Sequence, residues 1–220
     1  MNLKRVIELL LSLPKSLYVC LHFFSIGQSL RLPILVRYNT RIISLKGQIR
    51  LSGGGRIKIG FGKISEFDKS FERSIISLNG DIAIETPCSF GQGCRVISEK
   101  GSKLEIGKSF NNTAKLTISN RGNIKIGSGC LVSWNTWICD TDFHRLVDIE
   151  TGEVSNPNGE VVIGNNVWMA ANSQVMKGAH IPDGCIVATG SLVRGAYTED
   201  NCLLAGSPAK VKRQNVTWKK

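Results

Sequence analysis

The sequence contains three histidines, and one of them stands where acid–base chemistry would be expected. His144 ends the run Asp140-Thr-Asp-Phe-His144. A hydroxyl group is a poor nucleophile at neutral pH, and imidazole is the side chain best suited to remove its proton. We therefore predict that His144 is a general base and that Asp142 or Asp140 orients its ring. The alternative is that the two aspartates only cap the turn.

The other two histidines do not follow an acidic run of this kind. His22 lies in an apolar N-terminal segment, and His180 lies on an outward edge of a regular repeat. A catalytic zinc ion needs three protein ligands, and only His144 and His180 fall within the repeat region. No metal site is therefore predicted, and a zinc-dependent enzyme such as a carbonic anhydrase is disfavoured.

The scaffold that positions His144 is predicted from a six-residue period. An aliphatic or Met side chain begins each of six consecutive steps, and a small or short side chain fills most of the fifth positions. The first positions are Ile163, Met169, Val175, Ile181, Val187 and Val193, and the fifth are Val167, Ser173, Ala179, Cys185 and Ser191. Neither a helix nor a flat strand has this period, whereas a solenoid with one inward residue per step does. Three steps form one triangular coil, and successive coils stack about 4.8 Å apart.

The repeat extends towards the N-terminus in a less regular form. The phrase apolar-x-apolar-Gly recurs and predicts a short strand that enters a tight corner, where glycine permits unusual dihedral angles. It ends at Gly60, Gly107, Gly127 and Gly164. Residues 61–75 fall out of register and are expected to bulge. Residues 145–160 carry turn residues and are expected to leave the solenoid as a loop, the usual place for a functional site.

Charge and cysteine content narrow the function classes. The formal net charge is +11, and it is concentrated at the two ends, with a nearly neutral body. No nucleic-acid-binding motif accompanies the basic residues, so nucleic acid is not an expected partner. Four of the seven cysteines occupy the small inward position of a repeat step and are expected to fill the core. They are Cys88, Cys94, Cys130 and Cys185. We predict no disulfides and a reducing, cytoplasmic location.

The basic N-terminal segment has an apolar run that stops at Pro14-Lys15 and a second run from Leu17 to Ile26. Neither run is long enough to span a bilayer, and no signal-peptide cleavage site follows. We expect a short amphipathic helical segment. It would either cap the open end of the solenoid or contact an anionic membrane at the inner membrane face.

Three phrases between Trp134 and Arg213 resemble the hexapeptide-repeat acyltransferases, in particular the maltose, galactoside and nodulation-factor O-acetyltransferases. They are Asp140-Thr-Asp-Phe-His144, Ile163-Gly-Asn-Asn-Val-Trp168-Met-Ala-Ala171-Asn and Ala205-Gly-Ser-Pro-Ala-Lys-Val211. The resemblance implies an all-β, left-handed parallel β-helix. It divides the chain into a basic helical or capping segment at 1–40, a catalytic β-helix at 41–204 and a basic tail at 205–220.

The resemblance also implies the activity and the cofactor site. Family members transfer an acetyl group from acetyl-CoA to a hydroxyl, in clefts between the subunits of a trimer, and His144 matches their catalytic histidine. The positions expected to contact acetyl-CoA are Trp168, Ala170, Ala171, Thr189, Arg194, Lys210 and Arg213. The turn at 169–171 is also a candidate source of N–H donors for the oxyanion. Arg194 departs from the family pattern, because the cation has moved by one position.

The acceptor is less well defined by sequence. Asn111 and Asn112 lie near the family's acceptor-binding asparagine but out of register, and Trp134 and Asn135 begin the matched region. We take these four as candidate acceptor contacts. The expected reaction is O-acetylation of a saccharide, preferably a surface-polysaccharide precursor, by direct attack in a ternary complex. An amino-sugar N-acetyltransferase, a serine O-acetyltransferase and a non-catalytic solenoid scaffold are the alternatives.

Overall fold

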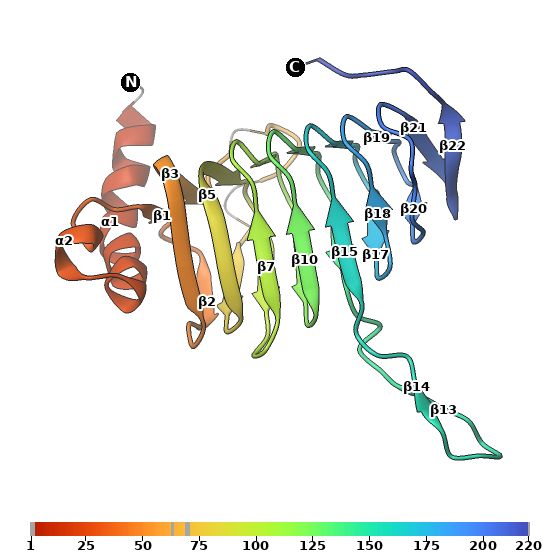
Figure 1. The fold of residues 1–220 in the computed structure, drawn as a ribbon. Helices are drawn as coiled ribbons and strands as arrows, with labels where there is room; N and C mark the ends of the chain where they lie inside the picture. The colour runs from red at the N-terminus through yellow and green to blue at the C-terminus, as the bar shows by residue number, and fades with distance from the viewer. Residues whose placement is uncertain (1–2, 63, 69–70, 220) are drawn as a thin grey trace.

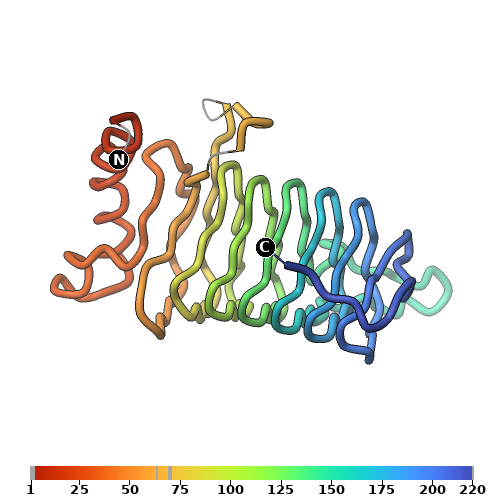
Figure 2. The backbone as a smooth tube through the Cα atoms, turned by 90° about the horizontal axis from the view of Figure 1, so that it is seen from above, coloured from red at the N-terminus to blue at the C-terminus, as the bar shows by residue number. Residues whose placement is uncertain are grey.

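The fold is a single stack of β-coils with helices at one end. It is known from a computed structural model that describes residues 3–62, 64–68 and 71–219, so parts of the segments 1–40, 61–75 and 205–220 lie outside it. The coils follow one another from the N-terminal to the C-terminal end, and a hairpin projects away from the stack (Figure 1). Seen from above, the described part of 61–75 forms a bulge at the side of the stack, as predicted (Figure 2).

Two helices precede the coils. Helix α1 spans Leu3–Phe23 and helix α2 spans Ile26–Ser29. Helix α1 continues through Pro14, where the first apolar run of the sequence stops. Proline removes one backbone hydrogen bond, and the carbonyl that it leaves unpaired belongs to Leu10, on an exposed part of the helix. The expectation of runs too short to cross a membrane is also corrected, since α1 is long and apolar enough by length and composition.

Helix α1 packs on the first coil through a side made of small residues. Its buried residues are Ser12, Ser16, Val19 and Cys20. The Ser16 hydroxyl accepts a hydrogen bond from Val36 N at 2.9 Å, and the Ser12 hydroxyl accepts one from Tyr38 N at 3.0 Å. These bonds satisfy backbone groups at the open edge of the solenoid, where β1 (Ile34–Val36) would otherwise expose them. The apolar side of α1 is consequently left outside.

Parallel strands form the faces of the coils. One sheet of 13 strands covers two faces, because its long strands turn the corner between them. Its members are β1, β3 (Gln48–Ile59), β5 (Asp81–Phe90), β7 (Lys103–Ile106), β8 (Asn111–Asn112), β10 (Asn123–Ile126), β11 (Leu131–Val132), β15 (Glu160–Ile163), β16 (Trp168–Met169), β18 (His180–Ile181), β19 (Ile186–Val187), β21 (Leu203–Gly206) and β22 (Ala209–Arg213).

The third face is a sheet of seven strands. The loop at 145–160, which leaves the stack and which we call the excluded loop, carries a small sheet of its own. The third face contains β2 (Arg41–Ser44), β4 (Ile75–Leu78), β6 (Arg95–Ser98), β9 (Thr117–Asn120), β12 (Trp137–Cys139), β17 (Gln174–Met176) and β20 (Leu192–Val193). The loop between β12 and β15 pairs β13 (Leu146–Val147) with β14 (Val154–Ser155) in an antiparallel hairpin. The loop predicted at 145–160 is this projecting hairpin (Figure 1).

The six-residue period is confirmed as the source of the core. All six predicted first positions, from Ile163 to Val193, are at most 2% exposed, and so are the five predicted fifth positions. The four cysteines assigned to the inward register are buried as well. Equivalent positions in successive coils therefore stack into apolar columns, and this burial is the main source of stability for the fold.

The corner glycines are needed for a reason other than the predicted one. Gly127 and Gly164 do not have positive φ values. Instead, a Cβ atom on Gly127 would lie 2.5 Å from the carbonyl oxygen of Gly164, which occupies the same corner in the next coil. The coils therefore approach too closely at this edge for any side chain. Gly60, with φ of +83°, is the one recurring corner glycine among the four that does fit the original prediction.

The C-terminal segment is ordered against the coils. Strand β22 pairs antiparallel with β21, so Lys210 and Arg213 stand on a strand and not on a flexible terminus as expected. Beyond β22 the chain turns back across the stack (Figure 1). There the Trp218 indole N–H donates to the Asn166 carbonyl at 2.6 Å.

Candidate active site

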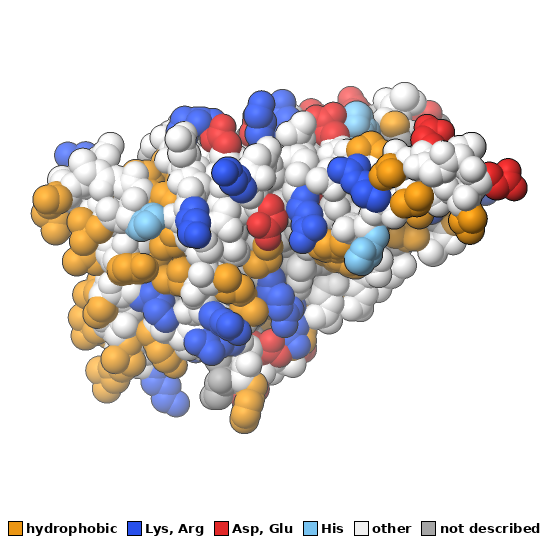
Figure 3. All heavy atoms as spheres, turned by 90° about the horizontal axis from the view of Figure 1, so that it is seen from below, with side chains coloured by type: hydrophobic (Ala, Val, Ile, Leu, Met, Phe, Trp, Pro, Cys, Tyr) orange, Lys and Arg blue, Asp and Glu red, His pale blue; other side chains and the backbone are white. Residues whose placement is uncertain are grey.

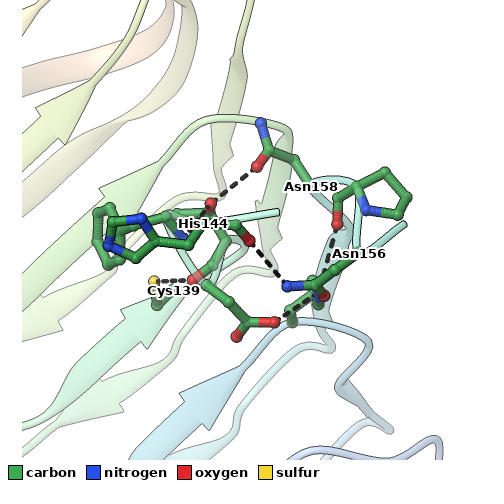
Figure 4. A network of polar contacts seen from close by, with 9 residues as sticks. Cys139, His144, Asn156 and Asn158 are labelled. Atoms are coloured by element: carbon green, nitrogen blue, oxygen red, sulfur yellow. Dashed lines mark hydrogen bonds and ion pairs between the residues drawn. The ribbon is translucent and has the colours of Figure 1, made fainter. Parts of the chain in front are cut away.

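His144 lies at the foot of the excluded hairpin, on an exposed turn that follows β12. Its backbone carbonyl accepts a hydrogen bond from the Asn156 side chain at 3.0 Å. Among the residues that the structure describes, none hydrogen-bonds to the imidazole. The ring points away from Asn156 and Asn158 (Figure 4). The main chain of His144 is therefore anchored, and its ring is available to a substrate.

The turn before His144 is fixed by hydrogen bonds. Phe143 has a φ of +65°, which is rare for a bulky side chain and costs free energy. Its N–H donates to the Thr141 hydroxyl at 3.0 Å, and this hydroxyl donates to Asn158 Oδ1 at 2.7 Å. The Asn158 amide in turn donates to the carbonyl of Arg121, in the preceding coil, at 3.1 Å. The strained conformation is thus held from both sides of the loop.

The inward carboxylate of this turn is Asp140. The six-residue register makes Asp142 the fifth residue of the step that starts at Ile138 and so predicts that it faces inward, but Asp142 is exposed and this prediction is wrong. Asp140 is fully buried and accepts hydrogen bonds from Arg121 N at 2.7 Å, Gly122 N at 2.8 Å and Asn120 Nδ2 at 2.7 Å. These three donors belong to the corner of the preceding coil. Asp140 therefore joins two coils at the base of the loop, which agrees with the turn-cap alternative for this residue.

Asp142 is turned outward and paired with a cation. Its side chain is 47% exposed, and its Oδ2 lies 2.6 Å from Lys177 Nζ. Hydrogen bonding to Lys177, more than any other factor, holds the pKa of Asp142 below its ordinary value. The same ammonium group contacts Asn156 Oδ1 and lies 3.3 Å from the Pro157 carbonyl. Lys177 thus ties both ends of the hairpin to the next coil.

One cysteine outside the predicted inward set lies on the strand that leads to His144. Cys139 ends β12, and its thiol lies 3.0 Å from the carbonyl of Thr141 (Figure 4). The residue is buried, and burial raises the pKa of its thiol. A neutral, buried thiol is a poor nucleophile. Its proximity to His144 therefore does not suggest a covalent mechanism.

The residues predicted to contact acetyl-CoA occupy several places. Trp168 lies half-buried on the outer side of β16, where its N–H donates to the Ser133 hydroxyl at 3.3 Å. The Trp218 ring packs against it at a centroid distance of 6.3 Å. Ala170 is buried, and its N–H donates to the Val187 carbonyl at 2.9 Å. That N–H is already used within the stack, so Ala170 does not supply the predicted oxyanion donor.

Ala171 and Thr189 share one edge of the solenoid. They follow β16 and β19, and Gly190 N donates to the Ala171 carbonyl at 3.1 Å. We call this the alanine edge. His144 and Lys177 follow β12 and β17 at a different edge, which we call the loop edge. Arg194 belongs to the loop edge, because its charge contributes to the lowered pKa of Asp142. One chain does not bring His144 next to Thr189.

The four predicted acceptor contacts also have separate settings. Asn112 is buried, accepts from Gly91 N at 3.1 Å and donates to the Val132 carbonyl at 3.3 Å. It joins coils and is not exposed to a ligand, so this prediction is wrong. Asn111 is half-buried on β8, Trp134 packs edge-on against Phe67 at 6.3 Å, and Asn135 is exposed in a turn. The structure does not place these three beside His144.

Sequence reasoning missed several residues that surround His144. Lys177 and Asn156 organise the loop, and Arg121, Trp137 and Phe143 form a cluster beside it. Only Asn156-Pro-Asn-Gly159 carried a signal, as turn chemistry. The other contacts join different coils, which no local pattern reveals. Among the residues described by the structure, no group of three or more His, Cys, Asp or Glu side chains could hold a metal ion.

Comparisons of sequence and of structure find relatives of this chain among known proteins. No model of a protein family matches the chain. A polysialic acid O-acetyltransferase of Neisseria meningitidis is 34% identical over 59% of this chain and 60% of its own length. A polysialic acid O-acetyltransferase of Escherichia coli O1:K1 is 29% identical over 56% of this chain and 40% of its own length. The chain thus spans roughly half the length of these curated relatives.

The fold has a solved counterpart in the crystal structure of the polySia-specific acetyltransferase NeuO. The two superpose with a TM-score of 0.67 and 21% identity, over 84% of this chain and 80% of the other. The predicted left-handed parallel β-helix is confirmed. The chain resembles the hexapeptide-repeat O-acetyltransferases, and polysialic acid O-acetyltransferases are among its relatives.

Proposed function

We propose that the protein transfers an acetyl group from acetyl-CoA to a hydroxyl of a saccharide, and that the saccharide is a precursor of a surface polysaccharide. The observation that carries this proposal is His144. Its backbone is anchored by Asn156, while its exposed imidazole has no hydrogen-bond partner among the described residues. Homology to polysialic acid O-acetyltransferases supports the saccharide acceptor.

The reaction follows from this position of the imidazole. The acceptor hydroxyl attacks the thioester carbonyl while His144 removes its proton, which gives a tetrahedral oxyanion and an imidazolium. When the intermediate collapses, the C–S bond breaks, and the imidazolium returns the proton to the departing thiolate as free CoA. No covalent enzyme intermediate is required. Asp140 and Asp142 act by holding the turn that carries His144, since both are bonded to other partners.

We place the active site between two copies of the chain. Trp168, Ala171 and Thr189 would form the wall that contacts the pantetheine arm, but they lie away from the loop edge that carries His144. A second copy that presents its alanine edge to the loop edge of the first would complete the site. A closed ring of three copies satisfies every such contact, so the proposed assembly is a homotrimer. Lys210 and Arg213 on β22 would pair with the CoA phosphates.

The apolar side of α1 fits the surface of an anionic membrane. Side chains exposed by at least 40% line the helix: Leu3, Ile7, Leu10, Leu11, Leu13, Tyr18 and Leu21. They contribute to the apolar surface at the N-terminal end (Figure 3). The exposed cations Arg5 and Arg31 lie on the same segment. We propose that a cytoplasmic enzyme rests on the inner membrane face through this helix. Flotation with phosphatidylglycerol vesicles, but not with phosphatidylcholine vesicles, would support this.

The enzymatic proposal is tested by release of free thiol from acetyl-CoA in the presence of a panel of saccharides and amino sugars. The wild-type protein should release thiol with a hydroxyl acceptor, and His144→Ala should lower kcat by about 10²–10⁴-fold. His180→Ala is the matched control, because His180 is an exposed histidine of the repeat outside this turn. Acetylation only of amino groups would favour the N-acetyltransferase alternative. No turnover and no acetyl-CoA binding would indicate a scaffold.

A further inference from the structure

Three side chains that the proposed reaction leaves unused form a cluster next to His144. Phe143 immediately precedes His144 and is 45% exposed. Its ring stacks on Trp137, with a centroid distance of 6.4 Å and an interplanar angle of 23°. The guanidinium carbon of Arg121 lies 5.0 Å from the centroid of the Phe143 ring. An exposed aromatic ring and a cation thus share one surface at the base of the loop.

The conformation of Phe143 keeps this ring exposed at a cost. A residue with φ of +65° is usually Gly or Asn, because a Cβ atom is disfavoured there. The Thr141 hydroxyl and Asn158 hold the turn in this conformation. Closing the turn does not require a phenyl ring, since glycine would close it without strain. The turn by itself therefore does not account for a phenyl ring at position 143.

Trp137 provides a rigid base for the ring. It lies on β12, between Thr117 and Gln174 of the neighbouring coils, and its indole N–H donates to the Ser119 hydroxyl at 3.1 Å. The indole is half-buried, so it cannot turn away from Phe143 without losing this bond and its packing. The phenyl ring, which is 45% exposed, is thus held in a fixed position.

Arg121 provides an available positive charge. Its backbone is held by Asp140, but its guanidinium forms no ion pair with any residue that the structure describes. The two carboxylates of this turn are engaged elsewhere, Asp140 by backbone N–H groups and Asp142 by Lys177. A guanidinium that lies over an aromatic ring and lacks an anion is suited to bind a carboxylate through two parallel hydrogen bonds.

We infer that Arg121, Phe143 and Trp137 form an acceptor subsite for a pyranose ring that bears a carboxylate. This inference rests on the proposed function and names the acceptor class for that site. The apolar C–H face of the sugar would lie on the phenyl ring, and its carboxylate would pair with Arg121. Because Phe143 and His144 are consecutive, a hydroxyl of the bound sugar lies within reach of the imidazole. Acidic saccharides should therefore be preferred over neutral ones.

Binding can be measured without turnover. Tryptophan fluorescence of the intact protein would be titrated with oligosaccharides of sialic, glucuronic or galacturonic acid, and with the carboxyl-reduced form of each. For at least one pair, the acid should bind at least about tenfold more tightly than its reduced form. Arg121→Gln should remove this preference, and Arg121→Lys should restore only part of it. Phe143→Leu should weaken both members of the pair by about tenfold.

Two control variants and one control measurement isolate the subsite. Lys108→Gln removes an exposed cation, and Phe71→Leu removes an exposed phenyl ring, in both cases away from the loop edge. Neither should change saccharide binding. Sedimentation of Phe143→Leu and Arg121→Gln should match that of the wild type, whereas a loss of assembly would show that the cluster packs between subunits and would overturn the inference.

The outcomes separate this inference from the proposed function. An acid preference that Arg121→Gln abolishes, in a protein that releases no thiol with any acceptor, would support the subsite and refute the acetyltransfer. Thiol release that responds to His144→Ala but is unchanged by Arg121→Gln and Phe143→Leu would overturn the subsite alone. Equal binding of every acid and its reduced form would also overturn it.

Discussion

Lys177 Nζ lies 2.6 Å from Asp142 Oδ2 and so connects the turn that carries His144 to the following coil. Lys177 directly follows β17, which pairs with β12, and it also contacts Asn156, where the chain returns from the hairpin. Asn156 in turn binds the carbonyl of His144. A single ammonium group therefore contacts the loop at both of its ends. This arrangement makes Lys177 a positioning residue for His144.

Breaking the pair should loosen the loop more than it destabilises the protein. A partly exposed ion pair contributes at most about 1 kcal/mol to the free energy of unfolding. Asp142→Asn and Lys177→Met should therefore leave the melting temperature nearly unchanged but speed hydrogen exchange at residues 143–156 and lower kcat. The two effects should not add in the double variant. Additive losses of kcat would show that the two residues act separately.

The same pair predicts a dependence of loop order on pH. The pKa of Asp142 is below its ordinary value of 3.8, chiefly because the folded state offers the Lys177 hydrogen bond. A depressed pKa contributes stability above the unfolded-state value, and this contribution is lost as the pH falls through the folded-state value. Loop protection measured by hydrogen exchange should thus be constant near neutral pH and decline only below about pH 4. Asp142→Asn should remove this decline.

Asp140 should contribute more than Asp142 to the free energy of unfolding. Its carboxylate accepts from three donors in a buried corner, so Asp140→Asn turns an acceptor into a group with its own N–H hydrogens. The free energy of unfolding in urea should fall by about 1–3 kcal/mol. Asp142→Asn, two residues away and exposed, is the matched control. Equal losses from the two substitutions would contradict a coil-joining role for Asp140.

A substitution at Gly127 tests how closely neighbouring coils approach each other at this corner. In Gly127→Ala the new Cβ atom would lie 2.5 Å from the Gly164 carbonyl, so the backbone of one coil must move. Unfolding free energy should drop by about 1–3 kcal/mol, as in other overpacked cores. Gly27→Ala, which meets nothing within 4 Å in helix α2, should be neutral or slightly stabilising. Comparable effects at the two sites would argue against tight corner packing.

The cysteines should be inert in the folded protein. Burial raises the pKa of Cys88, Cys94 and Cys130 to about 11, so their thiolate forms are scarce at pH 8. Alkylation by iodoacetamide, followed by mass spectrometry, should be slow for all seven buried thiols and rapid only in denaturant. Rapid labelling of Cys139 in the native protein would instead mean that the loop opens often.

Sequence reasoning was accurate wherever a residue's environment repeats with the chain. The register that places Ile163, Val175 and Cys185 in the core depends on local geometry, and each coil reproduces it. The same register failed at Asp142, because the hairpin begins there and the chain no longer follows the coil. The carboxylate that faces inward is Asp140, two positions before Asp142.

The sequence by itself determined the solenoid and the extent of the excluded loop, because both follow from residue type and spacing along the chain, and it singled out His144 as the proposed base. Only the tertiary structure decided which groups surround that histidine. Arg121, Asp140 and Lys177 come from three successive coils, and they meet because coils stack in space at the same edge. Contacts between coils depend on register and corner packing, which are properties of the folded chain and not of any local segment.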